Sequence, residues 1–132
     1  MTDSRRKVLL VDDEKFLLEI YSIKFLRRGF DVFACGSADE AITTLEKGYE
    51  PDVIVFDITM PHKSGYEFLE ELQYLKLAKH ALKVALTNES QEAEMRRTKE
   101  LGAVAHLVKA RFTAGEVVDQ VELLLEKNHS LF

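Results

Sequence analysis

Five short apolar runs recur along the chain, and the segments between them have a helical hydrophobic period, so strands and helices should alternate. The run at residues 53–56 is apolar at every position, which is typical of a parallel strand covered on both faces. We therefore expect a doubly wound α/β domain, with helices on both faces of a five-stranded parallel sheet. The expected strands are residues 7–11, 30–34, 52–56, 82–86 and 104–108.

The segments between the runs carry apolar side chains at helical spacing, which should face the sheet. Ser37 and Glu40 are spaced as a capping box for the second helix, and a third helix is expected over residues 66–77. A fourth helix, around residues 90–101, has little apolar face and should be weakly anchored. The expected inward positions are Phe16, Ile20, Ile23 and Leu26, widened by Leu17, Tyr21 and Phe25, then Ala38, Ala41, Ile42 and Leu45, and finally Val117, Val118, Val121, Leu124 and Leu125.

Length and composition indicate one domain, residues 1–132 with a core at about 6–127, because 132 residues match a single domain. The apolar runs are too short to span a bilayer, and the N-terminus has no apolar segment of a signal peptide. The lone Cys35 suits a reducing compartment, so a cytoplasmic location with no membrane contact is expected. Eighteen basic and 23 acidic residues argue against direct nucleic-acid binding. Only residues 128–132 should follow the expected last helix, so we expect an output domain to be a separate protein or part of a longer chain.

Chemically active side chains follow the predicted strands, at the edge where ligands bind in such sheets. Asp12 and Asp13 follow the first strand, Asp57 the third, Thr87 the fourth and Lys109 the fifth. Each residue also has a simpler interpretation. Asp12 or Asp13 could cap the first helix and Thr87 the fourth, and Asp57 stands where any turn-forming residue would serve. A lone lysine such as Lys109 is usually solvated. Their convergence on one edge favours a functional site.

Three neighbouring carboxylates repel one another unless cations join them. Lys109 provides one positive charge, and a divalent ion would provide another. The four histidines, His62, His80, His106 and His129, are scattered without the spacing of a zinc site. Oxygen ligands favour Mg²⁺, which commonly meets phosphate groups in proteins. A carboxylate beside Mg²⁺, a lysine and a hydroxyl is equipped to attack a phosphoryl group.

The chain resembles the receiver (CheY-like) domains of two-component response regulators along nearly its whole length. The motifs that carry the resemblance are Val8-Leu9-Leu10-Val11-Asp12-Asp13-Glu14, Asp57-Ile58-Thr59-Met60-Pro61 with Gly65, then Thr87 and Lys109. The resemblance implies a flavodoxin-like sheet of order 2-1-3-4-5 and a signalling role as a phosphoprotein. It also implies partners, namely a sensor histidine kinase or phosphotransfer protein upstream and a target protein or output domain downstream.

The resemblance also assigns roles to individual residues. Asp57 would accept the phosphoryl group, and Asp13, Asp57 and the backbone carbonyl of Thr59 would bind Mg²⁺ directly, with Asp12 acting through water. Thr87 and Lys109 would hold the phosphoryl oxygens. The domain would not be an enzyme in the usual sense, although self-phosphorylation from small donors and slow autodephosphorylation are expected.

Three positions depart from the family pattern. Asn88 replaces a small residue and should narrow the access to the phosphoacceptor. His106 stands where a switch tyrosine or phenylalanine is usual. Ala110 replaces a proline after Lys109, so we expect a trans Lys109–Ala110 peptide, with one extra residue before Phe112. Lys109 should still point its ammonium group toward Asp57, because the three carboxylates otherwise lack a fixed cation.

Other functions are less compatible with these residues. A flavodoxin-like electron carrier needs a phosphate-binding loop after the first strand, where the acidic residues would repel an anion. A hydrolase of the haloacid dehalogenase type usually has a second aspartate two residues after its nucleophile, where this chain has Thr59. A receiver-like module that works through unphosphorylated contacts stays open because of Asn88 and Ala110.

Overall fold

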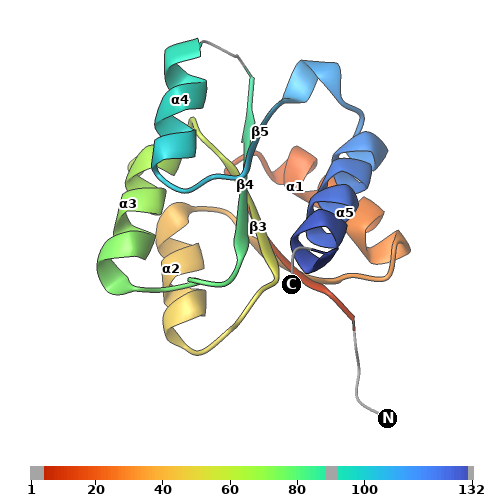
Figure 1. Cartoon of the computed structure of the whole chain (residues 1–132), viewed down its shortest axis with the longest axis horizontal. Coiled ribbons are helices and arrows are strands. Elements are labelled where there is room, and N and C mark those ends of the chain that lie inside the picture. Colours follow the sequence, from red (N-terminus) through yellow and green to blue (C-terminus); the bar gives the residue numbers. More distant parts are fainter. Residues whose placement is uncertain (1–4, 89–91, 131–132) are drawn as a thin grey trace.

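The computed structural model describes residues 5–88 and 92–130, and in it five parallel strands form one sheet of order β2-β1-β3-β4-β5 (Figure 1). The predicted fold class and strand order are therefore confirmed. The strands are β1 (Lys7–Val11), β2 (Asp31–Cys35), β3 (Val53–Asp57), β4 (Leu82–Thr87) and β5 (Ala105–Val108). Each differs from its predicted range by no more than one residue at either end.

Helices cover both faces of the sheet in two layers (Figure 1). On one face lie α1 (Lys15–Arg27) and α5 (Ala114–Ser130). On the other face lie α2 (Ala38–Glu46), α3 (Gly65–Leu75) and α4 (Glu92–Glu100). No helix in the described ranges is both long and apolar enough to cross a membrane.

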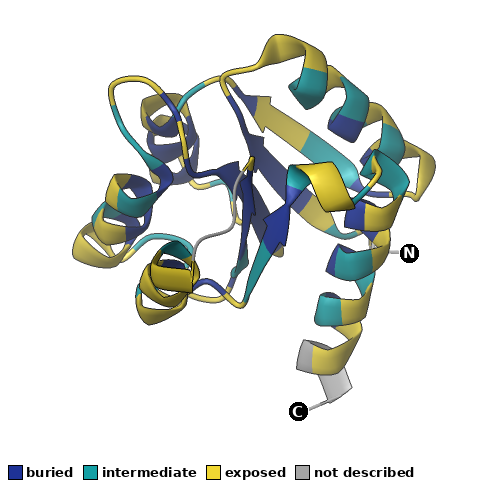
Figure 2. Cartoon of the chain, turned by 90° about the horizontal axis from the view of Figure 1, so that it is seen from above, coloured by how far each residue is buried: buried dark blue, intermediate teal, exposed yellow. Residues whose placement is uncertain are grey.

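The central strand β3 is buried at every position, as its continuous apolar sequence predicts (Figure 2). Successive side chains alternate between the two helical layers. Val53 and Val55 belong to the core beneath α1 and α5, whereas Ile54 and Phe56 belong to the core beneath α2 and α3. The strands of the sheet are held in register with one another, and this register fixes the positions of the residues that follow each strand.

The inward face of α1 agrees with the prediction only in part. Tyr21 and Phe25 are the buried residues of this helix, whereas Phe16 is 74% exposed and Ile23 and Leu26 are also exposed. Both stripes are apolar at helical spacing, so periodicity alone does not distinguish them. The direction from which α1 approaches β1, β2 and α5 decides which stripe is buried.

Two other local predictions need correction. The helix α3 ends at Leu75, before residue 77, because Lys76 adopts a left-handed conformation with φ of 57°. At α2, the Ser37 hydroxyl accepts the Glu40 N–H, but the Glu40 carboxylate accepts the Gly36 N–H, so the expected reciprocal box is incomplete. The predicted start of α4 at Ser90 lies outside the described residues.

Candidate functional site

The polar residues at the carboxyl ends of the strands converge, as predicted. Asp57 ends β3, Thr87 ends β4, and Lys109 follows β5 in a short 3₁₀ turn, η1 (Lys109–Arg111). One carboxylate oxygen from each of Asp12, Asp13 and Asp57 lies within 4.8 Å of the other two. Asp12, Asp57 and Thr87 are buried, and Asp13 is exposed at the mouth of the cluster.

Lys109 forms the fixed positive charge of this cluster. Its Nζ donates to Asp12 Oδ2 at 3.0 Å and to Asp57 Oδ2 at 3.3 Å, and its side chain is only 8% exposed. Burial by itself would lower the pKa of Lys109, but the charges of Asp57 and Asp12 outweigh it and the pKa is raised. The ammonium group therefore stays protonated beside the two carboxylates, and the predicted direction of Lys109 is confirmed.

Asp57 is held in an unfavourable environment for a negative charge. Its pKa is raised from 3.8 to about 6. Burial is the largest cause and Asp12 adds to it, while Lys109 and the N–H of Thr59, which donates to Asp57 Oδ1 at 3.2 Å, oppose the shift. At neutral pH the group is ionised but poorly compensated. Such a carboxylate gains from any added cation and is a competent nucleophile.

Helix capping does not account for these side chains. The N-cap residue of α1 is Glu14, with no side-chain cap, and Asp12 Oδ1 accepts the N–H of Glu14 at 2.9 Å just before the helix. Thr87 is the last residue of β4, and Asn88 after it is not helical, so Thr87 does not start a helix. Both simpler interpretations are therefore wrong for this fold.

Gly65 keeps the loop after β3 close to Asp57. A Cβ atom at Gly65 would lie 2.7 Å from the backbone oxygen of Asp57 and 2.8 Å from Ile58 Cα, so any other residue would force the backbone here to shift. The Gly65 N–H donates to Ile58 O at 2.8 Å. A reciprocal capping box between Ser64 and Glu67, which the sequence analysis missed, starts α3 at the same point. The C-terminal end of the loop that carries Thr59 is thus held in place by the Gly65–Ile58 hydrogen bond and by the capping box of α3.

The segment after Lys109 follows the predicted path. No cis peptide occurs in the described ranges, so the Lys109–Ala110 bond is trans, and the turn η1 accommodates the extra residue. Phe112 packs against the core beneath α1 and α5. Thr113 and Glu116 then form a reciprocal pair of hydrogen bonds at the start of α5, so Thr113 caps this helix. Asn88 lies exposed next to Thr87.

His106 makes a contact that the sequence did not indicate. Its Nδ1 lies 3.0 Å from the Oγ1 of Thr98, the one buried residue of α4. Thr98 Oγ1 also lies 2.9 Å from Met95 O, which can only accept, so the hydroxyl proton goes there and His106 Nδ1 donates. The Nε2 atom of His106 is then a buried acceptor without a partner in the described chain. Burial lowers the pKa of His106, in keeping with a neutral ring.

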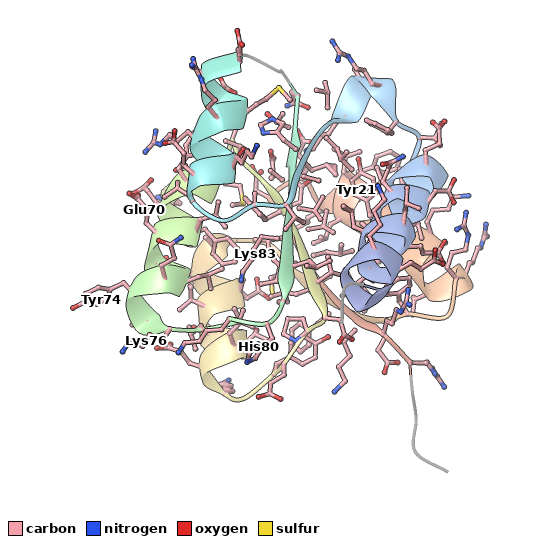
Figure 3. The ribbon with its side chains drawn as sticks, viewed as in Figure 1. Tyr21, Glu70, Tyr74, Lys76, His80 and Lys83 are labelled. Carbon is pink, nitrogen blue, oxygen red and sulfur yellow. The ribbon has the colours of Figure 1, made fainter. Side chains whose placement is uncertain are left out.

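Tyr21 is a second residue of the site that sequence reasoning placed only in the core. It lines a cavity of about 10 Å³ together with Asp12 and Asp57. Burial raises its pKa; Lys109 opposes the shift and the carboxylates add to it. Figure 3 labels it on the α1 side of the sheet. The only signal in the sequence was a hydroxyl-bearing aromatic residue on an otherwise apolar stripe.

The carboxylate cluster has the chemistry and size of a magnesium site. All three ligand candidates are oxygens, and two oxygens bound to one Mg²⁺ lie about 3–4 Å apart, as follows from Mg–O distances near 2.1 Å. The separation of up to 4.8 Å requires only a small closure of the cluster. A divalent ion would also offset the charge that Lys109 leaves uncompensated.

Known proteins share both the sequence pattern and the fold. A family model described as a response regulator receiver domain matches residues 8–122. The chain is similar to the chemotaxis protein CheY4 of Vibrio cholerae, with 27% identity, a TM-score of 0.83, and coverage of 90% of this chain and 98% of that one. The receiver domain of a Francisella response regulator, 1452, is 25% identical with a TM-score of 0.82, covering 94% and 99% of the two chains. A CheY-like receiver domain from Methanospirillum hungatei, 21% identical over 98% and 100% of the chains with a TM-score of 0.86, shares the fold.

Proposed function

Because the chain belongs to the response regulator receiver domains, a family of signalling domains, we propose that it accepts a phosphoryl group on Asp57 in a Mg²⁺-dependent reaction. The observation that carries this proposal is the buried Asp57 carboxylate itself, in contact with Lys109 and within 4.8 Å of two further carboxylates. Burial raises the pKa of this carboxylate, so its negative charge is poorly stabilised in the free site.

The donor is a phosphohistidine of a sensor histidine kinase or phosphotransfer protein. An Asp57 carboxylate oxygen attacks the phosphorus, the P–N bond breaks, and its electron pair stays on the imidazole nitrogen. Lys109 would turn one of its donors from the carboxylates to a phosphoryl oxygen, and the Thr87 hydroxyl would donate to another. Small phosphodonors react in the same way, and slow hydrolysis returns the free carboxylate.

Asp13, Asp57 and the Thr59 carbonyl are the proposed direct ligands of Mg²⁺, with Asp12 acting through water. The ion, when bound, supplies positive charge that offsets the charge of the transferred phosphoryl oxygens. Asp13 suits this role because it is exposed and makes no ion pair in the described structure, so it can turn toward an entering ion.

The exposed stripe of α1 supports a protein as the phosphodonor. Phe16, immediately after the acidic loop, is 74% exposed, and Ile23 lies two turns further along the same stripe with 43% exposure. A partner that covered this stripe would bring its phosphorylated side chain to the carboxylates. The exposed parts of these apolar side chains would then be buried.

The output of the switch would be a change at α4 and β5. The helix α4 buries only Thr98, and its hydrogen bond to His106 ties it to β5. When Thr87 moves toward a phosphoryl group on Asp57, the space it leaves would admit the His106 ring, which would then pull on α4. A downstream protein or output domain would recognise the altered surface.

Phosphorylation in vitro tests the proposal directly. Incubation with acetyl phosphate and Mg²⁺, followed by intact mass measurement, should show one added phosphoryl group in the native chain and in Asp119→Asn, which alters an exposed aspartate. Asp57→Asn should show none. Labelling of Asp57→Asn would contradict the assignment. A folded native chain that stays unlabelled with both acetyl phosphate and a phosphohistidine donor would favour a module working through unphosphorylated contacts.

A further inference from the structure

A second pocket lies at the end of the sheet opposite the carboxylates. Its volume is about 300 Å³, and it is enclosed by the second half of α3, the loop that follows, the start of β4 and the turn between α4 and β5. Leu72, Leu77 and Leu101 provide apolar wall. The Gln73 side chain donates to Leu101 O at 2.8 Å, which joins two sides of the pocket.

Three lysines, Lys76, Lys79 and Lys83, line this pocket, and no carboxylate of the described chain lines it with them. None of the three has a carboxylate of the described residues within ion-pair distance. The whole chain has a net charge of -5, so this positive region is a local departure from the average. Figure 3 shows Lys76 and Lys83 at the lower ends of α3 and β4.

Lys83 is the most informative of these residues. It pairs with Ile54 in the β3–β4 register, so its side chain leaves the sheet on the α3 and α4 side. Its half-buried ammonium group donates to Ala78 O at 2.5 Å, the one acceptor it has among the described residues. An ammonium group has three donors, and burial lowers the pKa of Lys83 without a compensating charge. A charge placed in this way is costly unless a counter-ion joins it.

The loop that carries these lysines is strained. Lys76 has φ of 57° and Ala78 has φ of 52°, and neither is a glycine. A left-handed alanine is uncommon and must be held in place by its surroundings. Here the Ala78 carbonyl accepts a hydrogen bond from the half-buried Lys83 ammonium group, which links the strained loop directly to this charge.

We propose that this pocket binds a small amphipathic anion, with its carboxylate or phosphate head between Lys83 and Lys79 and its apolar body against the leucines. The volume is at the lower end of small-molecule sites, which favours a compact ligand over a protein segment. The anion would supply the negative charge that no described residue places beside Lys83, and Lys79 would provide a second positive charge for its head group. This site is separate from the phosphoacceptor and does not depend on the function proposed above.

Titration of the ¹⁵N-labelled chain with hexanoate and with hexyl phosphate tests this inference. The expected result is saturable amide shifts in the α3–β4 loop, at Lys83 and at Gly102, without shifts at Asp12, for one or both probes; which probe binds more tightly identifies the head group. Hexanamide, which has the same chain without the charge, should cause none. Shifts confined to the carboxylate cluster, or no saturable shift with either anion, would overturn the proposal. So would saturation only by an acidic, leucine-containing peptide.

Matched variants separate a binding role from a structural one. Lys83→Met keeps the apolar stem and removes the charge, and it should weaken hexanoate or hexyl phosphate binding about tenfold or more, the worth of one charge-assisted hydrogen bond. Lys79→Gln should weaken it several-fold, which keeps the test valid if Lys83→Met folds poorly. Lys24→Met, on α1 across the sheet, should bind as the native chain does. Unchanged affinity in both pocket variants would refute the proposal.

Discussion

The burial of the charged Asp57 side chain should lower the free energy of unfolding of the metal-free, unphosphorylated chain. Replacing this residue with a neutral one should show the size of this effect. In metal-free buffer Asp57→Asn substitutes a neutral side chain of nearly the same shape. Asp57 is 2% exposed, and its pKa rises from 3.8 to about 6, first because of burial and then because of Asp12, with Lys109 opposing the shift. The native carboxylate is therefore tolerated at neutral pH at a cost in folding free energy.

The sign of this effect follows from proton linkage. The folded chain holds the Asp57 proton more tightly than the unfolded chain does, so the free energy of unfolding falls as pH rises from about 4 and levels off above about 6. A shift from 3.8 to about 6 corresponds to about 3 kcal/mol at pH 8. Asp57→Asn should therefore be more stable than the native chain by about 3 kcal/mol at pH 8, and by about half as much at pH 5, where the native carboxylate is largely protonated.

Urea denaturation with a chelator at pH 5, 6, 7 and 8 measures this difference. Because the chain has no tryptophan, far-ultraviolet circular dichroism is the suitable signal. Glu19→Gln, which neutralises an exposed acid on α1, is the control and should change stability little at any pH. An Asp57→Asn chain that is no more stable than the native one at pH 8, or whose advantage does not grow with pH, would refute the reasoning from burial.

Three further outcomes are expected. Asp13→Ala should abolish Mg²⁺ binding in calorimetric titration. Chelation should leave the native chain folded by circular dichroism, because Lys109 offsets part of the carboxylate repulsion. Unfolding on chelation would show that the ion is structural. Gly65→Ala should lower the free energy of unfolding by about 2–3 kcal/mol or more in urea denaturation, because its Cβ would overlap the Asp57 backbone. It should also make phosphorylation slower. Gly36→Ala, whose Cβ has its nearest contact at 3.6 Å, should change stability little. Phosphorylation should shift the amide resonances of α4 and β5. Thr98→Val should produce part of this shift without phosphorylation, since it removes the hydrogen bond from α4 to His106 of β5. Resonances of α4 and β5 that stay unchanged on phosphorylation would contradict the proposed switch.

Much of the fold could be predicted because it depends on short-range patterns. Strands buried on both faces read as continuous apolar runs, and residues 53–56 identify the centre of the sheet without any tertiary information. Parallel strands bring their carboxyl ends to one edge, so Asp57, Thr87 and Lys109 could be assigned to one site from their positions after strands. The trans peptide after Lys109 followed from the chemistry of alanine alone.

The sequence by itself thus determined the order of the elements and the edge on which the polar residues converge. Only the tertiary structure decided which stripe of α1 is buried, and with it the place of Tyr21 beneath the carboxylates. The bond between Thr98 and His106 also depends on it, as does the position of Lys83, which has no carboxylate partner among the described residues. Each of these involves side chains from separate elements, and their meeting depends on how a helix is rotated and where it lies on the sheet. Hydrophobic periodicity constrains this rotation only to a broad apolar face, and packing against the whole core selects one orientation within it.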